Sequence, residues 1–207
     1  MRKLILLDAD STLFNEEVID LLSAKAGREK EVSEITALAM NGDLDFESSL
    51  RSRVALLDGL PEKVLDQVQR QISLTTGAME LISYAKKHDH LVAVVSGGFT
   101  QVLAPICEGI GIDLFIANNL EIVNERLTGN LLGPVIDRAA KARALIDFAN
   151  SHDIPIEQTI AIGDGANDID MIKEAGLGIA FCAKRALNEV ADIQISERNL
   201  YLVTNYL

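Results

Sequence analysis

Four short runs of apolar residues constrain the fold of this chain more than any other feature of its sequence. They cover residues 4–7, 91–95, 159–162 and 177–181. None of them alternates polar with apolar residues, and β-branched residues are frequent in them, which is typical of strands buried on both faces. We therefore expect a parallel sheet at the centre of the fold, with a weaker fifth strand at 114–117.

Segments with helical spacing separate the later runs. Apolar residues recur every three or four positions at 76–88 and 139–149, and similarly at 167–175 and 186–191. This alternation predicts an α/β fold with a doubly wound parallel sheet. Residues 120–136 interrupt it with two short β-rich runs, for which we expect a hairpin.

Between residues 16 and 72, only helical patterns occur. The candidate helices are 16–26, 29–40, 46–57 and 62–72. This is more helix than a single crossover between two strands requires. We interpret it as an inserted helical cap: residues 1–13 and 74–207 would form the catalytic core, and residues 14–73 the cap that selects the substrate.

Acidic, hydroxyl and glycine residues follow three of the apolar runs directly. They are Asp8 and Asp10 after the first run, Ser96, Gly97 and Gly98 after the second, and Asp164, Asn167 and Asp168 after the third. Because ligands of an open parallel sheet bind at the carboxyl ends of its strands, we expect these residues at one edge. Converging carboxylates repel one another unless a cation compensates. Mg²⁺ takes carboxylates, waters and a phosphate oxygen as ligands, so we expect a Mg²⁺ site that binds a small phosphate compound.

A phosphoryl group at this edge suggests a chemical mechanism. The Ser96 hydroxyl and the amides around Gly97 would hold its oxygens. Lys141, near the start of the helix that follows the hairpin, would balance the charge of the transition state. Asp8 would attack phosphorus and form an acyl phosphate. Asp10 would protonate the leaving alkoxide and then take a proton from the hydrolytic water.

These residues resemble, in order, the four motifs of the haloacid dehalogenase superfamily of phosphatases. Residues 8–12 (Asp-Ala-Asp-Ser-Thr) are similar to the first motif, 96–98 (Ser-Gly-Gly) to the second, Lys141 to the third, and 163–168 (Gly-Asp-Gly-Ala-Asn-Asp) to the fourth. The resemblance to one member extends over nearly the whole chain. It implies hydrolysis of O-phospho-L-serine to L-serine and phosphate through an aspartyl-phosphate, the last step of L-serine biosynthesis.

The resemblance also implies a role for each motif residue. Asp8 would be the nucleophile and Asp10 the general acid and base. Mg²⁺ would be held by the Asp8 carboxylate, the Asp10 backbone carbonyl and Asp164, with Asp168 supporting the metal shell. The residues expected to hold the phosphate or its surroundings are Ser96, Gly97, Lys141 and Asn167.

In the cap, the resemblance implies that Glu17 pairs with the substrate ammonium and Arg53 with its carboxylate, while Met40 and Phe46 close the pocket. A zwitterionic head group needs one anionic and one cationic anchor, and the arginine fork suits a carboxylate.

Two neighbours compete for these cap roles. Arg51 lies two residues from Arg53, and residues two apart on a helix point to different faces. Glu16 competes with Glu17 in the same way. The match to the family positions favours Arg53 and Glu17.

Three other functions stay open at this point. A related phosphatase or phosphotransferase could act on another small phosphate, such as phosphohomoserine. An aspartate-phosphorylated signalling module also uses an acidic cluster with a lysine, although its lysine comes last in the chain and it lacks a long helical insertion. An inactive binding module is the third.

The formal charge of the chain is −12, from 19 basic and 31 acidic side chains. This balance argues against nucleic acid and an anionic membrane surface as partners. Two cysteines are too few for a disulfide framework, and no apolar run is long enough to cross a membrane. We expect a cytoplasmic protein with no regulatory extension before Met1. Its oligomeric state, monomer or homodimer, stays open.

Overall fold

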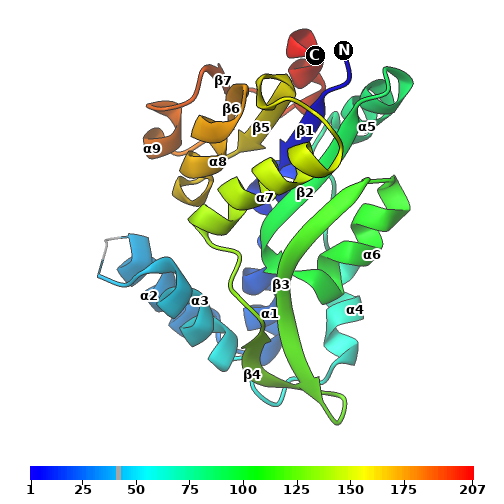
Figure 1. Ribbon diagram of the computed structural model, residues 1–207. Coiled ribbons are helices and arrows are strands. Elements are labelled where there is room, and N and C mark those ends of the chain that lie inside the picture. The colour runs from blue at the N-terminus through cyan, green and yellow to red at the C-terminus, as the bar shows by residue number, and fades with distance from the viewer. Residues whose placement is uncertain (41–42) are drawn as a thin grey trace.

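The computed structural model describes residues 1–40 and 43–207, with the backbone alone of Met40. Its strands are β1 (Leu4–Leu7), β2 (Leu91–Phe99), β3 (Leu114–Val123), β4 (Arg126–Leu132), β5 (Thr159–Gly163), β6 (Leu177–Phe181) and β7 (Ile193–Ile195). Within the described residues they form one seven-stranded sheet in the order β4-β3-β2-β1-β5-β6-β7 (Figure 1). Neighbouring strands pair in parallel except for β3 and β4. This confirms the predicted α/β fold.

Helices cover both faces of the sheet. They are α5 (Ala78–Lys87), α6 (Thr100–Ile110), α7 (Arg138–Ser151), α8 (Ile169–Glu174) and α9 (Arg185–Asn188). In β1, Ile5 and Leu7 pack into the core beneath α5 and α6, whereas Leu4 and Leu6 pack into the core beneath α7, α8 and α9. Both faces of each central strand are therefore buried, which explains why the strand sequences do not alternate.

The register of the central strands places the predicted motif residues next to one another. Leu7, the last residue of β1, lies opposite Val94 of β2 and Ile162 of β5. The amide of Asp8 continues this ladder by donating to the carbonyl of Ile162 at 2.9 Å. The carboxyl ends of three neighbouring strands thus meet at one edge.

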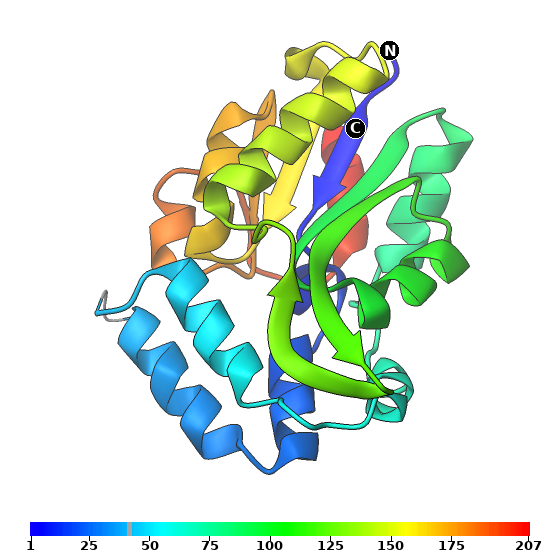
Figure 2. The ribbon, with the colours of Figure 1, turned by 60° about the horizontal axis from the view of Figure 1, so that its bottom comes forward.

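The predicted helices between the first two strands are all present. They are α1 (Val18–Ala26), α2 (Glu29–Met40), α3 (Phe46–Ala55) and α4 (Lys63–Gln69), here called the helical segment. The helical segment lies beyond the edge where β1 ends, away from the two chain termini (Figures 1 and 2). Each helix ends at or before its predicted end, and Gly27, at a φ of +66°, terminates α1. The division into a core and a cap stays a prediction.

Two linkers that pair with each other connect the helical segment to the sheet. The amide of Asn15 donates to the carbonyl of Ser73 at 3.0 Å, and the amide of Thr75 donates to the carbonyl of Leu13 at 2.9 Å. Phe14 and Leu74 form a β-bridge between these bonds. The chain therefore leaves and re-enters the core as a short antiparallel pair.

The predicted hairpin consists of the end of β3 and all of β4, and it contacts the helical segment. The amide of Gly59 donates to the carbonyl of Leu127 at 2.8 Å, and Leu127 donates to the carbonyl of Leu60 at 3.0 Å. Arg126 donates through Nη1 to the carbonyl of Gly59 at 2.6 Å. The connection between α3 and α4 is thereby tied to the hairpin.

Three local features differ from the sequence prediction. Ser96 and Gly97 belong to β2 itself, which extends to Phe99, instead of following the strand. Helix α6 was not predicted, because it contains Pro105 and its sequence continues the charge-free run of β2. Strand β7 spans only three residues, too few for a periodic signal. None of the helices within 1–40 and 43–207 has the length and hydropathy of a membrane-spanning helix.

Candidate active site

The ammonium group of Lys141 joins two carboxylates from different strand ends. Its Nζ donates to Oδ1 of Asp8 at 2.6 Å and to Oδ1 of Asp168 at 2.7 Å, and all three side chains are buried. Burial alone would lower the pKa of Lys141, but Asp168 and Asp8 together raise it above its usual value. Lys141 therefore stays protonated and pairs with both buried carboxylates.

Asp168 also fixes the loop after β5. Its Oδ2 accepts the amides of Asp164 at 3.2 Å and Gly165 at 3.1 Å. A Cβ atom at Gly163 would lie 2.5 Å from Cγ of Asp168, so only glycine leaves room for this carboxylate. Asp168 thus holds both Lys141 and the loop that carries Asp164.

Three carboxylates converge closely enough to share a metal ion. One oxygen each from Asp8, Asp164 and Asp168 lies within 4.8 Å of the others. Burial, followed by repulsion from Asp168, raises the pKa of Asp8 well above its usual range and that of Asp164 to about 6. Three carboxylates facing a single lysine leave uncompensated negative charge. An oxygen donor set of this kind fits a hard divalent cation.

Asp10 follows the first strand in a strained turn. Asp10 is extended, at a φ of −65° and a ψ of 134°, and Ser11 is left-handed, at a φ of 58°. Oδ1 of Asp10 is buried and has no hydrogen-bond partner among the described residues. Burial, then the charges of Glu17 and Asp8, raise the pKa of Asp10 well above its usual range. A carboxyl group in this state favours its protonated form and has an oxygen free for a ligand.

The end of β2 forms a tight polar wall beside Asp10. The hydroxyl oxygen of buried Ser96 accepts the amide of Gly98 at 2.8 Å. A Cβ atom at Gly98 would lie 2.9 Å from Oδ2 of Asp10, which explains the glycine. Asn118 donates to the carbonyl of Gly97 at 2.9 Å and accepts the amide of Ile136 at 2.8 Å.

Asn118 was not among the predicted site residues. It is a buried amide in β3, and it links the β2 end to the segment that leads into α7. Its one sequence signal is a polar side chain directly after the apolar run at 114–117, which is weak by itself.

The helical segment brings a second group of charges to this edge. The ring of Phe46 approaches to 3.3 Å the position that a Cβ atom would take at Gly97. Glu17 accepts a 2.6 Å hydrogen bond from the hydroxyl of Ser11. Burial lowers the pKa of Arg53, while the charges of Asp20 and Glu17 oppose this shift, so Arg53 lies within electrostatic reach of Glu17.

The two competing residues have other partners. Arg51 lies on the exposed face of α3, where its Nη2 contacts Oε1 of Glu47 at 2.7 Å. The carboxylate of Glu16 accepts the amide and the hydroxyl of Ser73 at 2.8 and 2.7 Å, across the paired linkers. Arg51 and Glu16 are therefore engaged away from the acidic cluster, whereas the charges that act on Arg53 are those of Asp20 and Glu17.

The two remaining predicted residues are Asn167 and Met40. Asn167 is half-buried, and its Oδ1 would lie 2.5 Å from a Cβ atom at Gly165, in the loop that carries Asp164 and Asp168. Met40 ends helix α2, but its side chain lies outside the described part of the chain.

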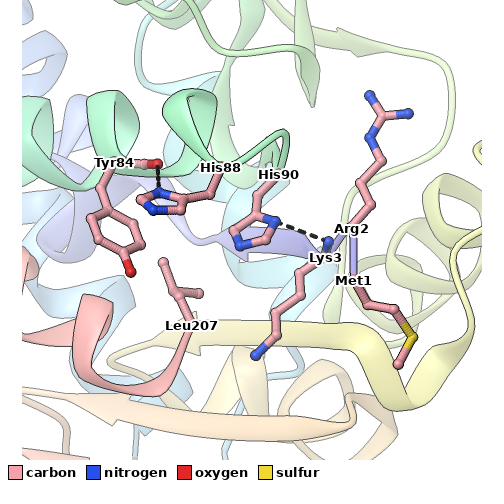
Figure 3. A pocket seen from close by; sticks show the side chains of 7 residues that line it. All are labelled: Met1, Arg2, Lys3, Tyr84, His88, His90 and Leu207. Carbon is pink, nitrogen blue, oxygen red and sulfur yellow. Dashed lines mark hydrogen bonds between the residues drawn. The ribbon is translucent and has the colours of Figure 1, made fainter.

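A separate hollow of about 430 Å³ lies near the start of β1 and the end of α5 (Figure 3). Its wall includes Tyr84, His88 and His90, whose rings stack in succession with centroids 4.1 and 6.2 Å apart. The amide of Lys3 donates to Nδ1 of His90 at 3.2 Å. Among the described residues, no acidic side chain lines this hollow, so it does not provide the chemistry predicted at the strand ends.

The chain matches the haloacid dehalogenase-like hydrolase family over residues 5–173. It is 52% identical over 195 residues to a phosphoserine phosphatase of Streptomyces coelicolor, with 94% of this chain covered. It is 47% identical over 206 residues to a phosphoserine phosphatase of Methanocaldococcus jannaschii, with 100% of this chain and 98% of the relative covered. A solved structure of a phospho-aspartyl intermediate analogue of phosphoserine phosphatase is 47% identical and superimposes with a TM-score of 0.94, covering 100% of this chain and 99% of the other.

The relatives differ in length. This chain spans 48% of the Streptomyces protein, about half of it, but nearly all of the Methanocaldococcus protein. The match therefore extends over nearly the whole Methanocaldococcus protein but over only part of the Streptomyces protein.

Proposed function

Because the chain belongs to the haloacid dehalogenase-like hydrolase family, we propose that it hydrolyses O-phospho-L-serine to L-serine and phosphate. The observation that carries this proposal is the contact of Lys141 with both Asp8 and Asp168, beside Asp164, at the strand ends. A buried cation against a carboxylate nucleophile is an arrangement suited to phosphoryl transfer. The relatives named phosphoserine phosphatase support the substrate, and the product would serve serine biosynthesis.

We propose Mg²⁺ as the cofactor. The Asp8 carboxylate, the Asp10 backbone carbonyl and Asp164 would hold it, and Asp168 would support this shell. Support comes from the three converging carboxylate oxygens and from the raised pKa of Asp164. When bound, the ion would withdraw negative charge from the phosphoryl oxygens.

In the first chemical step, a carboxylate oxygen of Asp8 would attack phosphorus while the bond from phosphorus to the serine oxygen breaks. Asp10, whose pKa is raised well above its usual range chiefly by burial, would give its proton to the departing alkoxide. The products of this step are L-serine and an aspartyl-phosphate on Asp8. Lys141 would hold the Asp8 side chain in line and balance the charge of the transferring group.

In the second step, Asp10 would take a proton from water as the water oxygen attacks phosphorus. The bond from phosphorus to Asp8 breaks, which frees phosphate and restores the Asp8 carboxylate. Ser96, Gly97, Lys141 and Asn167 would hold the phosphoryl oxygens during both steps. The buried Ser96 hydroxyl and the fixed backbone at Gly97 support this assignment.

We propose that residues 14–73 act as a cap that selects the substrate. Glu17 would pair with the ammonium group and Arg53 with the carboxylate, while Phe46 and Met40 cover the bound serine. The Phe46 ring beside Gly97 and the effect of the Glu17 charge on the pKa of Arg53 support this. A closed cap would exclude bulk water from the aspartyl-phosphate.

Four substrates separate these roles. O-phospho-L-serine carries both charged groups, 3-phosphooxypropanoate lacks the ammonium, phosphoethanolamine lacks the carboxylate, and phosphohomoserine is one methylene longer. We expect kcat/KM to be highest for phosphoserine in the presence of Mg²⁺. Glu17→Gln should reduce kcat/KM for phosphoserine by about 10- to 100-fold and barely affect 3-phosphooxypropanoate, because losing one partner of a charged hydrogen bond costs ~1.5–3 kcal/mol.

Arg53→Ala should show the complementary pattern, with a large loss on phosphoserine and little on phosphoethanolamine. Arg51→Ala is the matched control, because Arg51 pairs with exposed Glu47 on another face of the same helix. Faster turnover of phosphohomoserine would instead assign a related phosphatase activity. A stable phosphorylated Asp8 without turnover would point to a signalling module.

A further inference from the structure

We propose that Arg198 is a positioning residue for substrate selection: it fixes the turn at residues 11–15 so that the Ser11 hydroxyl holds the Glu17 carboxylate in place. This inference rests on the proposed function, because Glu17 is there the partner of the substrate ammonium. It adds Arg198 and Ser11, neither of which was a predicted site residue.

Arg198 spans the turn between β1 and the helical segment. Its Nη2 donates to the carbonyl of Ser11 at 3.2 Å and to the carbonyl of Phe14 at 3.5 Å. Its Nε donates to Oδ1 of Asn15 at 3.0 Å. Because the donors of a guanidinium have a fixed planar geometry, one side chain sets the separation of the two ends of this turn.

One of the two carbonyls that Arg198 contacts belongs to the strained residue of the turn, Ser11. Ser11 has a φ of 58° and a ψ of 0°, a left-handed conformation that is unfavourable for residues with a Cβ atom. Such a conformation persists only where the surroundings enforce it. The bond from Arg198 to the Ser11 carbonyl restrains this peptide group and thereby the direction of the Ser11 side chain.

The Ser11 side chain in turn holds Glu17. Its hydroxyl donates to Oε1 of Glu17 at 2.6 Å, a charge-assisted hydrogen bond. Glu17 carries negative charge close to Asp10, Asp20 and Asp164, as the effect of Glu17 on the pKa of each of them shows. Repulsion would turn the Glu17 side chain away from this edge, and the hydrogen bond from Ser11 opposes that movement.

Arg198 is itself held on the core side of the linkers. The next two residues dock on the chain that returns from the helical segment: the amide of Leu200 donates to the carbonyl of Thr76 at 2.8 Å. A Cβ atom at Gly77 would collide with the side chain of Asn199, so these segments approach closely. A continuous series of hydrogen bonds therefore links the core, through Arg198 and Ser11, to Glu17.

The test measures the ratio of kcat/KM for O-phospho-L-serine to kcat/KM for 3-phosphooxypropanoate, which has no ammonium group. Arg198→Gln should lower this ratio about 3- to 10-fold, and Ser11→Ala by a similar factor, because each removes hydrogen bonds that position Glu17. In a Glu17→Gln background, Arg198→Gln should cause no further fall in the ratio, since the group that it positions is already lost.

Arg126→Gln is the matched control. Arg126 likewise donates from its guanidinium to a backbone carbonyl, but to that of Gly59, in the connection between α3 and α4. We expect it to leave the ratio unchanged. If Arg198→Gln fails to fold, Arg198→Lys keeps the charge without the planar fork and should lower the ratio in the same direction.

An equal fall in kcat/KM on both substrates, or a full additional fall in the Glu17→Gln background, would overturn the proposal for Arg198 alone. A Glu17→Gln variant with an unchanged ratio would overturn the proposed role of Glu17 and this inference with it. Activity on 3-phosphooxypropanoate serves as the internal measure of an intact fold and intact chemistry.

Discussion

The acidic edge of the sheet and the face of the helical segment that meets it hold their charges in opposite ways. At the edge, the side chains of Lys141 and Asp168 are 0% exposed and that of Asp8 is 5% exposed, and they contact one another at 2.6–2.7 Å. On the helical segment, Glu17 and Arg53 are only partly buried. Among the described residues, Arg53 forms no ion pair within 4.0 Å.

This difference matches the proposed division between chemistry at the edge and substrate selection by the helical segment. Buried charges must satisfy one another, because an unpaired buried charge is strongly destabilising, and this requirement fixes the geometry around Asp8. Charges that keep some contact with water can stay unpaired in the protein and so remain available to a ligand. The edge is therefore suited to a reaction that needs fixed positions, and the helical segment to recognition of a charged substrate.

The largest expected effect comes from removing the proposed nucleophile, Asp8, at the edge. Asp8→Asn should reduce turnover by about 10⁴-fold or more, equivalent to ~5 kcal/mol in the barrier, because an amide cannot form the aspartyl-phosphate. The fold should persist, since the substitution keeps the side-chain shape and removes one carboxylate from a crowded cluster. Phosphate release and circular dichroism measure the two outcomes.

Asp170→Asn is the control for this substitution. Asp170 is an aspartate of α8 close to the same edge, but it pairs with Arg138 at the surface. We expect nearly normal turnover. An Asp8→Asn variant that keeps turnover within tenfold of the original protein would contradict the covalent mechanism.

The next largest effect is on the free energy of unfolding, and it compares a buried charge of the edge with a charge at the surface of α3. Lys141→Met should lower the free energy of unfolding by ~3–5 kcal/mol in the absence of metal, because it leaves Asp8 and Asp168 buried without their cation. Arg51→Met removes an equally short contact, with Glu47, but at the surface, where the change should be ~0–0.5 kcal/mol. Urea denaturation measures both values. A similar loss of unfolding free energy in both variants would contradict the view that the charges of the edge depend on their partners and those of the helical segment do not.

The sequence was sufficient to predict most of the acidic edge. Strands buried on both faces have a continuous apolar signal, and the residues that follow them must lie at the same end of a parallel sheet. This is why Asp8, Ser96 and Asp164 could be brought to one edge without knowledge of their contacts. Lys141 had no such signal, and only its order among the family motifs identified it.

The connections around the edge could not be predicted in this way. Asn118 and Arg198 donate to the backbone carbonyls of Gly97 and Ser11. Every residue type has a backbone carbonyl, so the sequence does not show which carbonyl a side chain will contact. Ser11 lies within a recognised motif, but its left-handed backbone is a property of the folded turn. These contacts join residues far apart in the chain, so local patterns carry no information about them.

The smallest expected effect is a pH-dependent response of the acidic edge to Mg²⁺. The pKa of Asp164 is raised from 3.8 to about 6 in the folded protein, chiefly by burial and by Asp168, so the folded state keeps a proton that the unfolded state has lost. Without metal, the stability that this group contributes is present below pH ~4 and is lost as the pH rises through about 6, by roughly 3 kcal/mol.

Mg²⁺ should reverse that loss, because its ligands must be deprotonated and an ion that binds only the folded state stabilises it. The rise in Tm on adding Mg²⁺ should therefore be larger at pH 7.5 than at pH 5. In Asp164→Asn, which cannot titrate, the metal-free protein should lose less stability over the same interval, and the response to Mg²⁺ should shrink. A rise in Tm of equal size at both pH values would mean that the ion does not compete with protons for these carboxylates, and that the repulsion at the edge is relieved by Lys141 alone.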